Sequence, residues 1–153
     1  MATMQDIITQ IQFSVFLVNK PGVLAQVTGA LAKSKVNVVA MTLVDSQEHG
    51  VLRLVAEDAQ AARETLGRLN LPMTETEVLR LEMSNRPGAL ADIATLLGEN
   101  HININYAYCT SGAPGGHTTG IFKVADPKKA EKVLKASGGK HKEAVVRRPA
   151  DRR

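Results

Sequence analysis

The hydrophobic positions of the chain follow one pattern that occurs twice, with an offset of 66 residues. Apolar residues occupy every second position over 11–17, as in a strand, and then recur three and four positions apart over 24–31, as on one face of a helix. The same two patterns return over 79–83 and 90–97. The aligned apolar pairs are Val15/Leu81, Leu17/Met83, Leu24/Leu90, Val27/Ile93, Leu31/Leu97 and Val36/Ile102. The spacing therefore predicts a duplicated structural unit.

After its first helix, each copy continues in the same way. The remaining predicted elements are second strands within 36–44 and 101–110, third strands at 51–57 and 120–125, second helices at 59–69 and 127–136, and fourth strands at 73–77 and 143–147. Asp58 and Asp126 suit the N-cap positions of the second helices. The order βαββαβ, present twice, predicts an α+β fold of two ferredoxin-like units, each an antiparallel sheet with its helices on one face.

The boundary between the copies contains no turn residue. Between Pro72 and Asn85 there is no Gly, Pro or Asn, so residues 73–84 are predicted to form one extended segment that joins the copies without a flexible linker. The predicted domains are residues 9–78 and 79–148, followed by a basic tail at 149–153.

Both copies place the motif Asn-(Lys/Arg)-Pro-Gly between the first strand and the first helix, as NKPG from Asn19 and NRPG from Asn85. The first amides of a helix have no intrahelical partner and favour a negatively charged group. Glycine at the helix start lets such a group approach the backbone. The candidate carboxylate-binding residues are Gly22, Val23 and Leu24 in the first copy and Gly88, Ala89 and Leu90 in the second.

A second pair of asparagines, Asn37 and Asn103, opens the second strand of each copy, where asparagine is uncommon. An amide oxygen can accept from an ammonium group and an amide NH₂ can donate to a carboxylate. Together with Asn19 and Asn85, these residues suit a zwitterion such as an amino acid. The alternative is that the motif is only good turn chemistry and that the strand asparagines only cap an edge.

These motifs resemble those of the ACT domain family, over about residues 11–148. The resemblance implies a βαββαβ regulatory module that binds an amino acid and controls a metabolic enzyme without being catalytic itself. It is similar in particular to serine-sensing ACT domains. It implies ligand contacts at Asn19 and Asn37 in one copy and at Asn85 and Asn103 in the other. No catalytic domain is expected in this chain, so the controlled enzyme would be a separate partner.

Charge and composition narrow the function classes. The net charge of +4 comes from residues 135–153, which hold seven basic and two acidic residues, while the rest of the chain is about neutral. A nucleic-acid partner is therefore not expected. No apolar segment is long enough to span a membrane, and the single Cys109, expected to be a buried strand residue, suits a reducing compartment, so a cytoplasmic location is predicted. The scattered histidines predict no metal site, and we expect no cofactor.

Assembly and occupancy are the remaining expectations. Exposed sheet edges and the ACT resemblance predict a homodimer or a close pairing of the two copies. A protein–protein assembly module that binds no ligand is the main alternative function. Asn105, Tyr106 and Tyr108 give the second copy more polar and aromatic groups, so the ligand is expected there.

Overall fold

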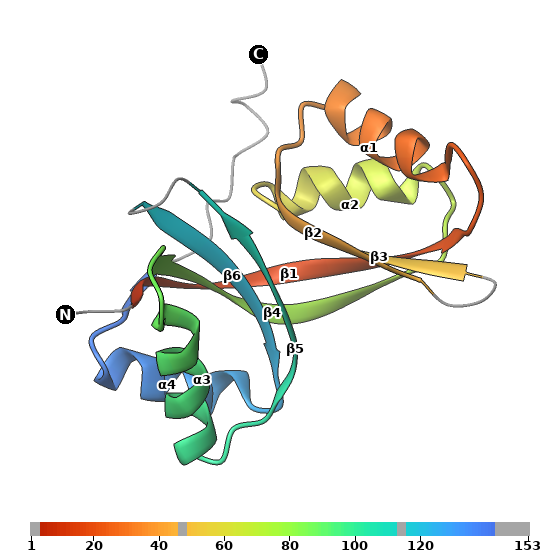
Figure 1. Cartoon of the computed structure of the whole chain (residues 1–153). Coiled ribbons are helices and arrows are strands. Elements are labelled where there is room, and N and C mark those ends of the chain that lie inside the picture. Colours follow the sequence, from red (N-terminus) through yellow and green to blue (C-terminus); the bar gives the residue numbers. More distant parts are fainter. Residues whose placement is uncertain (1–3, 46–48, 113–115, 143–153) are drawn as a thin grey trace. The chain divides into compact units, whose positions relative to one another are not determined.

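The computed structural model describes residues 4–45, 49–112 and 116–142 of the chain. Its elements, drawn in Figure 1, follow the predicted βαββαβ order twice, and β4 both ends the first repeat and begins the second. Their bounds are β1 Met4–Val18, α1 Val23–Lys33, β2 Val38–Asp45, β3 His49–Ala56, α2 Ala59–Gly67, β4 Met73–Ser84, α3 Ala89–Glu99, β5 Ile104–Ser111, β6 His117–Val124, α4 Pro127–Ala136 and β7 Lys140–Lys142. The predicted fold class is confirmed.

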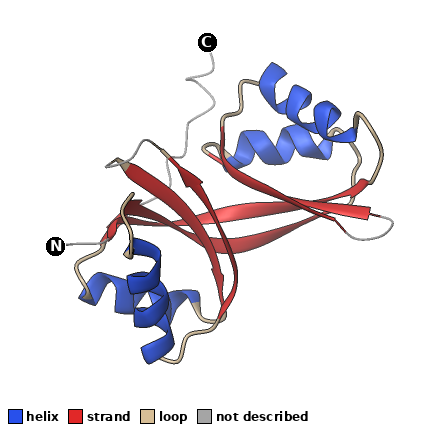
Figure 2. Ribbon diagram, viewed as in Figure 1, coloured by secondary structure: helices blue, strands red, loops and turns tan. Residues whose placement is uncertain are grey.

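The first compact unit consists of the described residues within 11–76. Its strand order is β2-β3-β1-β4, and the pairings of β3 with β1 and with β2 are antiparallel. Phe13 pairs with Leu54 and Val15 with Leu52, so these side chains share one face of the sheet. Helices α1 and α2 cover that face and complete a core of aliphatic side chains (Figure 2). The helical and strand periodicities meet in one core, as the sequence predicts.

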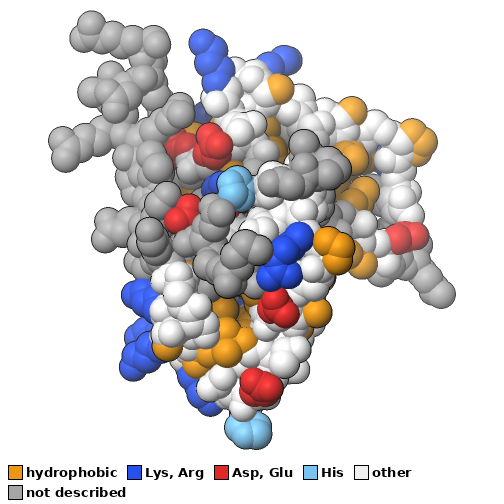
Figure 3. Space-filling view, turned by 60° about the vertical axis from the view of Figure 1, so that its left-hand side comes forward, with side chains coloured by type: hydrophobic (Ala, Val, Ile, Leu, Met, Phe, Trp, Pro, Cys, Tyr) orange, Lys and Arg blue, Asp and Glu red, His pale blue; other side chains and the backbone are white. Residues whose placement is uncertain are grey.

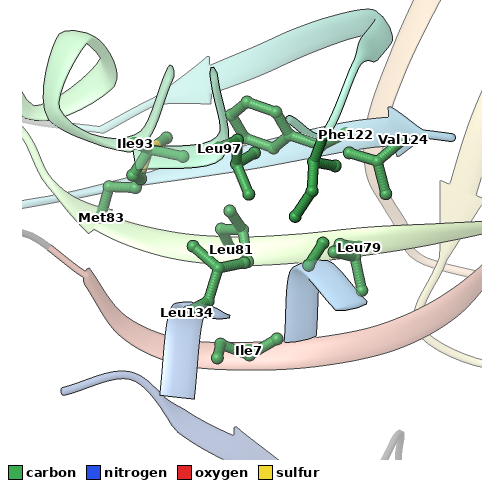
Figure 4. Close-up of a cluster of buried hydrophobic side chains, with 11 residues drawn as sticks. Ile7, Leu79, Leu81, Met83, Ile93, Leu97, Phe122, Val124 and Leu134 are labelled. Atoms are coloured by element: carbon green, nitrogen blue, oxygen red, sulfur yellow. The ribbon is translucent and has the colours of Figure 1, made fainter. Parts of the chain in front are cut away.

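The second compact unit consists of residues 4–10 and the described residues within 77–142. Its strand order is β5-β6-β4-β1, with β7 paired parallel to the start of β1. Figure 4 shows Ile7 of β1 among the core side chains of this unit. Ile7 is fully buried there, in the same cluster as Leu79, Leu81 and Leu134. The first residues of the chain are therefore part of the core of the second repeat.

This arrangement differs from a purely linear division at residue 78. The start of β1 occupies the place that a ferredoxin-like unit gives to its fourth strand. The first domain was expected to begin at residue 9, but the alternation of inward positions continues back to Ile7, and residues 4–10 belong to the second unit. The fourth strand predicted at 143–147 lies outside the described residues.

Local signals in the sequence are realised as expected. Residues 73–84 form one uninterrupted strand, β4. The Asp58 carboxylate accepts from the Ala61 amide at 3.0 Å and the Asp126 carboxylate from the Lys129 amide at 3.1 Å, so both residues cap their helices. No described helix is long and apolar enough to cross a membrane.

Positive charge is concentrated on α4. Its four lysines are all exposed, and Lys135 pairs with Glu131 at 3.2 Å. Figure 3 shows basic side chains gathered along the lower left edge of the face in view. The basic character of the chain is therefore not confined to the predicted tail.

An ion pair of the first unit makes a pH-dependent contribution to stability. The Arg63 Nε donates to both carboxylate oxygens of Glu75 at 3.0 Å, and the guanidinium lies 5.7 Å from the centre of the Phe13 ring. The hydrogen bond from Arg63 lowers the pKa of Glu75 below its ordinary value. A lowered pKa in the folded state gives stability that is present above the unfolded-state pKa and is lost as the pH falls through the folded-state pKa.

We therefore expect Glu75→Gln to reduce stability at pH 7 and to have a smaller effect at pH 3, because part of that stability is lost as Glu75 becomes protonated. Because both side chains are more than a third exposed, the effect at pH 7 is at most about 1 kcal/mol. Urea unfolding of both proteins at the two pH values measures it. A deficit of the same size at pH 3 would assign the effect to packing rather than to the ion pair.

Candidate functional site

A hollow of about 270 Å³ opens at one end of the first unit, and we call it the turn hollow. It lies where β1 and β2 end and where α1 and β3 begin. Its lining residues are Leu17, Val18, Asn19, Lys20, Val23, Leu24, Leu43, Val44, Asp45 and Gly50. Three predicted ligand-binding residues, Asn19, Val23 and Leu24, are among them. The hollow therefore borders the Asn-Lys-Pro-Gly turn, but Gly22, also a predicted ligand residue, is not among the residues that line it.

The backbone of this turn leaves the start of α1 open. Gly22 has φ 90° and ψ −13°, a left-handed conformation that favours glycine, and no side chain caps the helix. Within the described residues, the amides of Val23 and Leu24 have no hydrogen-bond partner. A Cβ atom added at Gly22 would meet no atom within 4 Å. The helix start is thus accessible to a negatively charged group.

Asn19 and Asp45 hold the rim of the turn hollow together. The Asn19 Nδ2 donates to the Asp45 carboxylate at 3.1 Å, which ties the end of β1 to the end of β2. Asp45 is exposed and lines the hollow, so part of its carboxylate remains available to a second donor. The sequence analysis missed Asp45, because the duplicated position in the second copy is Ser111 and no repeated pattern marks it.

Opposite charges line this hollow without neutralising each other. Lys20 and Asp45 both belong to its wall, and within the described residues neither side chain forms an ion pair. The site therefore offers an ammonium group, a carboxylate and an open helix start around one hollow. Charges of both signs at one small site match the two ends of a zwitterion.

The remaining wall is apolar. Leu17 is 3% exposed and belongs to the core, and Val23 and Leu24 pack against that core from α1. Leu43 and Val44, at the end of β2, are 48% and 45% exposed. The hollow therefore combines a polar rim with apolar surface that a ligand can cover.

The second copy uses the same motif differently. The Asn85 Nδ2 donates to the Gly112 carbonyl at 3.1 Å, the counterpart of the Asn19 contact. The Arg86 guanidinium, however, pairs with Asp92 at 2.9 Å and donates to the Pro87 carbonyl at 3.0 Å. A Cβ atom added at Gly88 would lie 3.4 Å from that guanidinium. Arg86 thus lies beside the start of α3. Its counterpart in the first copy, Lys20, leaves the start of α1 open.

Ala89 and Leu90, the other predicted ligand residues of the second copy, also differ from their counterparts at the start of α1. The Ala89 amide donates to the Arg86 carbonyl at 3.3 Å, so one of the first amides of α3 is already engaged. Leu90, next along α3, is 50% exposed. The expectation that the second copy is better equipped rests on Asn105, Tyr106 and Tyr108, but the turn contacts favour the first copy.

Asn37 and Asn103 lie at the other end of their own units. Asn37 precedes β2 while Asp45 ends it, and eight strand residues span roughly 25 Å. Asn103 precedes β5 in the same way, and Asn85 contacts Gly112 beyond the end of β5. One small ligand therefore contacts only one of these ends within a unit. A binding role for Asn37 and Asn103 stays a prediction that requires a contact from another unit or chain.

Neither the cysteine nor the acidic and histidine side chains of the described residues form a reactive centre. Cys109 is exposed on β5, so its expected burial is wrong, and desolvation raises the pKa of its thiol. A raised pKa disfavours the thiolate that a nucleophile needs. Among the described residues, no group of three or more His, Cys, Asp or Glu side chains could hold a metal ion.

Comparison with known proteins adds a family and a fold. The family profile of the ACT domain pair matches residues 8–142. Among solved structures, the chain is similar to protein BT0572 from Bacteroides thetaiotaomicron, at 28% sequence identity, with a TM-score of 0.78 over 85% of this chain and 89% of that one. No curated protein sequence matches it.

Two regulatory subunits of aspartate kinase share the fold. The subunit from Thermus thermophilus, in its ligand-free form, has 15% identity and a TM-score of 0.65, with 89% of this chain and 93% of that chain covered. The subunit from Thermus flavus has 17% identity and a TM-score of 0.58, with 84% and 90% covered. At this identity, the likeness concerns the architecture of the two repeats.

Proposed function

Since the chain belongs to the ACT family as a pair of ACT domains, we propose that it is a non-catalytic regulatory protein that binds an amino acid in the turn hollow. The ligand carboxylate lies at the start of α1 near Val23 and Leu24, close to Lys20. The ligand ammonium lies at Asp45. The regulated partner is a metabolic enzyme.

The observation that carries this proposal is the pair of opposite charges around one hollow that no described residue compensates. Among the described residues, Lys20 and Asp45 have no ionic partner, although both line the same small space. An unpaired charge at such a site is stabilised when a ligand supplies the opposite charge and a hydrogen bond. The α-ammonium and α-carboxylate of an amino acid supply both signs on neighbouring atoms, whereas a simple anion or cation supplies one.

The comparisons support the regulatory part of the proposal. The chain shares its fold with regulatory subunits of aspartate kinase, and it covers 93% and 90% of those two chains. Fold alone does not assign a ligand, so the amino acid rests on the chemistry of the hollow. The expected homodimer and a cytoplasmic location remain predictions of the same proposal.

We propose one such site per chain. In the second copy, Ser111 stands at the position of Asp45, so the carboxylate for the ligand ammonium is missing. Arg86, the counterpart of Lys20, is already paired with Asp92. The duplicated turn therefore supplies a ligand site in the first copy and a self-contained turn in the second.

The proposal predicts that at least one standard amino acid raises the melting temperature of the protein, since a ligand that binds only the native state stabilises it. Calorimetric titration with the best ligand should give about one site per chain. Lys20→Ala should weaken binding about tenfold through the loss of one charge-assisted contact, while the matched Arg86→Ala should leave the affinity unchanged.

Two results would contradict this assignment in different ways. Stronger weakening by Arg86→Ala than by Lys20→Ala would place the ligand in the second copy. The absence of any amino-acid binding would overturn the sensing function and favour the alternative of a ligand-free assembly module.

A further inference from the structure

From the walls of the turn hollow, we infer that its ligand is an α-amino acid with a compact aliphatic side chain, in the class of valine, leucine and isoleucine. This inference rests on the proposed function and adds to it the chemical class of the ligand side chain. The lining residues that are left to contact the ligand side chain, once its ammonium and carboxylate are bound, indicate the side-chain class.

The two charged side chains of the hollow, Lys20 and Asp45, are used by the ligand backbone. Lys20 and the start of α1 face the carboxylate, and Asp45 faces the ammonium. Asn19 already donates to Asp45 at 3.1 Å. Every other lining side chain among the described residues is apolar, and Gly50 has none. A charged side chain on the ligand would therefore lose hydration without finding an opposite charge among the described lining residues.

The apolar part of the wall gains most from an aliphatic group. Leu17, Val23 and Leu24 form the side that continues into the core of the first unit. Across the hollow, Leu43 is 48% exposed at the end of β2. A ligand side chain between these surfaces removes apolar area of both partners from water, which is the main source of affinity for such groups.

The volume suits a free amino acid rather than a larger ligand. The hollow of about 270 Å³ equals roughly nine water molecules at about 30 Å³ each. It is slightly smaller than the range of about 300–1,000 Å³ that holds drug-sized ligands. A compact branched side chain fits beside the two charged ends.

Gly50 gives a way to change the size of the hollow. It lies in β3 next to Leu43, and a Cβ atom added there would lie 3.4 Å from the Leu43 Cδ1 and 3.7 Å from the Val44 carbonyl oxygen. These are ordinary contact distances, and the left-handed glycines of the chain do not include Gly50. Gly50→Ala therefore narrows the hollow with little backbone strain.

The test is calorimetric titration of the full chain with alanine, valine, leucine, isoleucine, glutamate and lysine. We expect affinity to rise about fourfold for each additional CH₂ group that is buried between alanine and leucine. Glutamate and lysine should bind at least tenfold more weakly than leucine. Gly50→Ala should weaken leucine binding severalfold more than alanine binding. Gly98→Ala, a matched glycine change on α3 outside the hollow, should leave the order of affinities unchanged.

The possible results separate this inference from the proposed function. Binding of glutamate or lysine as tightly as leucine would overturn the aliphatic class while leaving amino-acid sensing intact. An equal effect of Gly50→Ala on leucine and alanine would show that the side chain does not occupy the apolar wall, and would overturn the inference. A failure of all six amino acids to bind would overturn the aliphatic class, and only a failure of every standard amino acid to raise the melting temperature would overturn the proposed function as well.

Discussion

Replacing Ile7 with alanine is expected to lower the free energy of unfolding by about 2–5 kcal/mol, the usual cost of truncating a buried isoleucine. Ile7 is fully buried in the core of the second unit together with Leu81 and Leu134. Its loss leaves a cavity among aliphatic side chains that pack on β4 and α4. Urea unfolding, with Leu134→Ala as a reference for this core, measures the effect.

The matched control is Ile8→Ala. Ile8 is the next residue of the same strand, and its side chain is only partly buried. Its truncation should cost less than half as much as that of Ile7, because less apolar area returns to water. If the two substitutions have the same small effect, then the first residues of β1 do not contribute to the core of the second unit. In that case another segment must supply the fourth strand of the second unit.

The fold was largely predictable because it depends on periodicity, which the duplication repeats. The two helix faces, the two aspartate caps and the continuous strand 73–84 all follow from local patterns that have one structural solution. The place of residues 4–10 was not predicted. The alternation of β1 extends back to Ile7, but periodicity shows only that a residue faces a core and does not say which core.

The candidate site was predictable only where the two copies agree. The shared Asn-(Lys/Arg)-Pro-Gly motif identified the turn, and Asn19, Val23 and Leu24 do line the hollow. Asp45 was missed because its counterpart is a serine. The different roles of Lys20 and Arg86 were hidden because both residues are basic. The difference arises from Asp92, which pairs with Arg86 and stands where the first copy has Gln26.

Asparagine in place of Asp45 is expected to weaken amino-acid binding by about tenfold to a hundredfold. A hydrogen bond to a charged group contributes about 1.5–3 kcal/mol, and the uncharged amide removes the attraction for the ligand ammonium. The substitution preserves the shape of the side chain and keeps an oxygen that accepts from Asn19. The turn should therefore stay in place, and calorimetric titration of the variant measures the loss of charge. Asp92→Asn, in the second copy, is the matched control and should bind as tightly as the wild type.

The 2-hydroxy acid with the same side chain as the best ligand separates the two possible roles of Asp45. Because this analogue has no ammonium group, the wild type should bind it at least tenfold more weakly than the amino acid. Asp45→Asn should lose little further affinity for it, so the preference for the amino acid should largely disappear in the variant. If the variant instead loses the same factor for both compounds, Asp45 acts by holding Asn19 and the turn, and the ligand ammonium is bound elsewhere. The preference between the two compounds, measured in both proteins, therefore decides whether the carboxylate at the end of β2 recognises the ligand or only shapes its site.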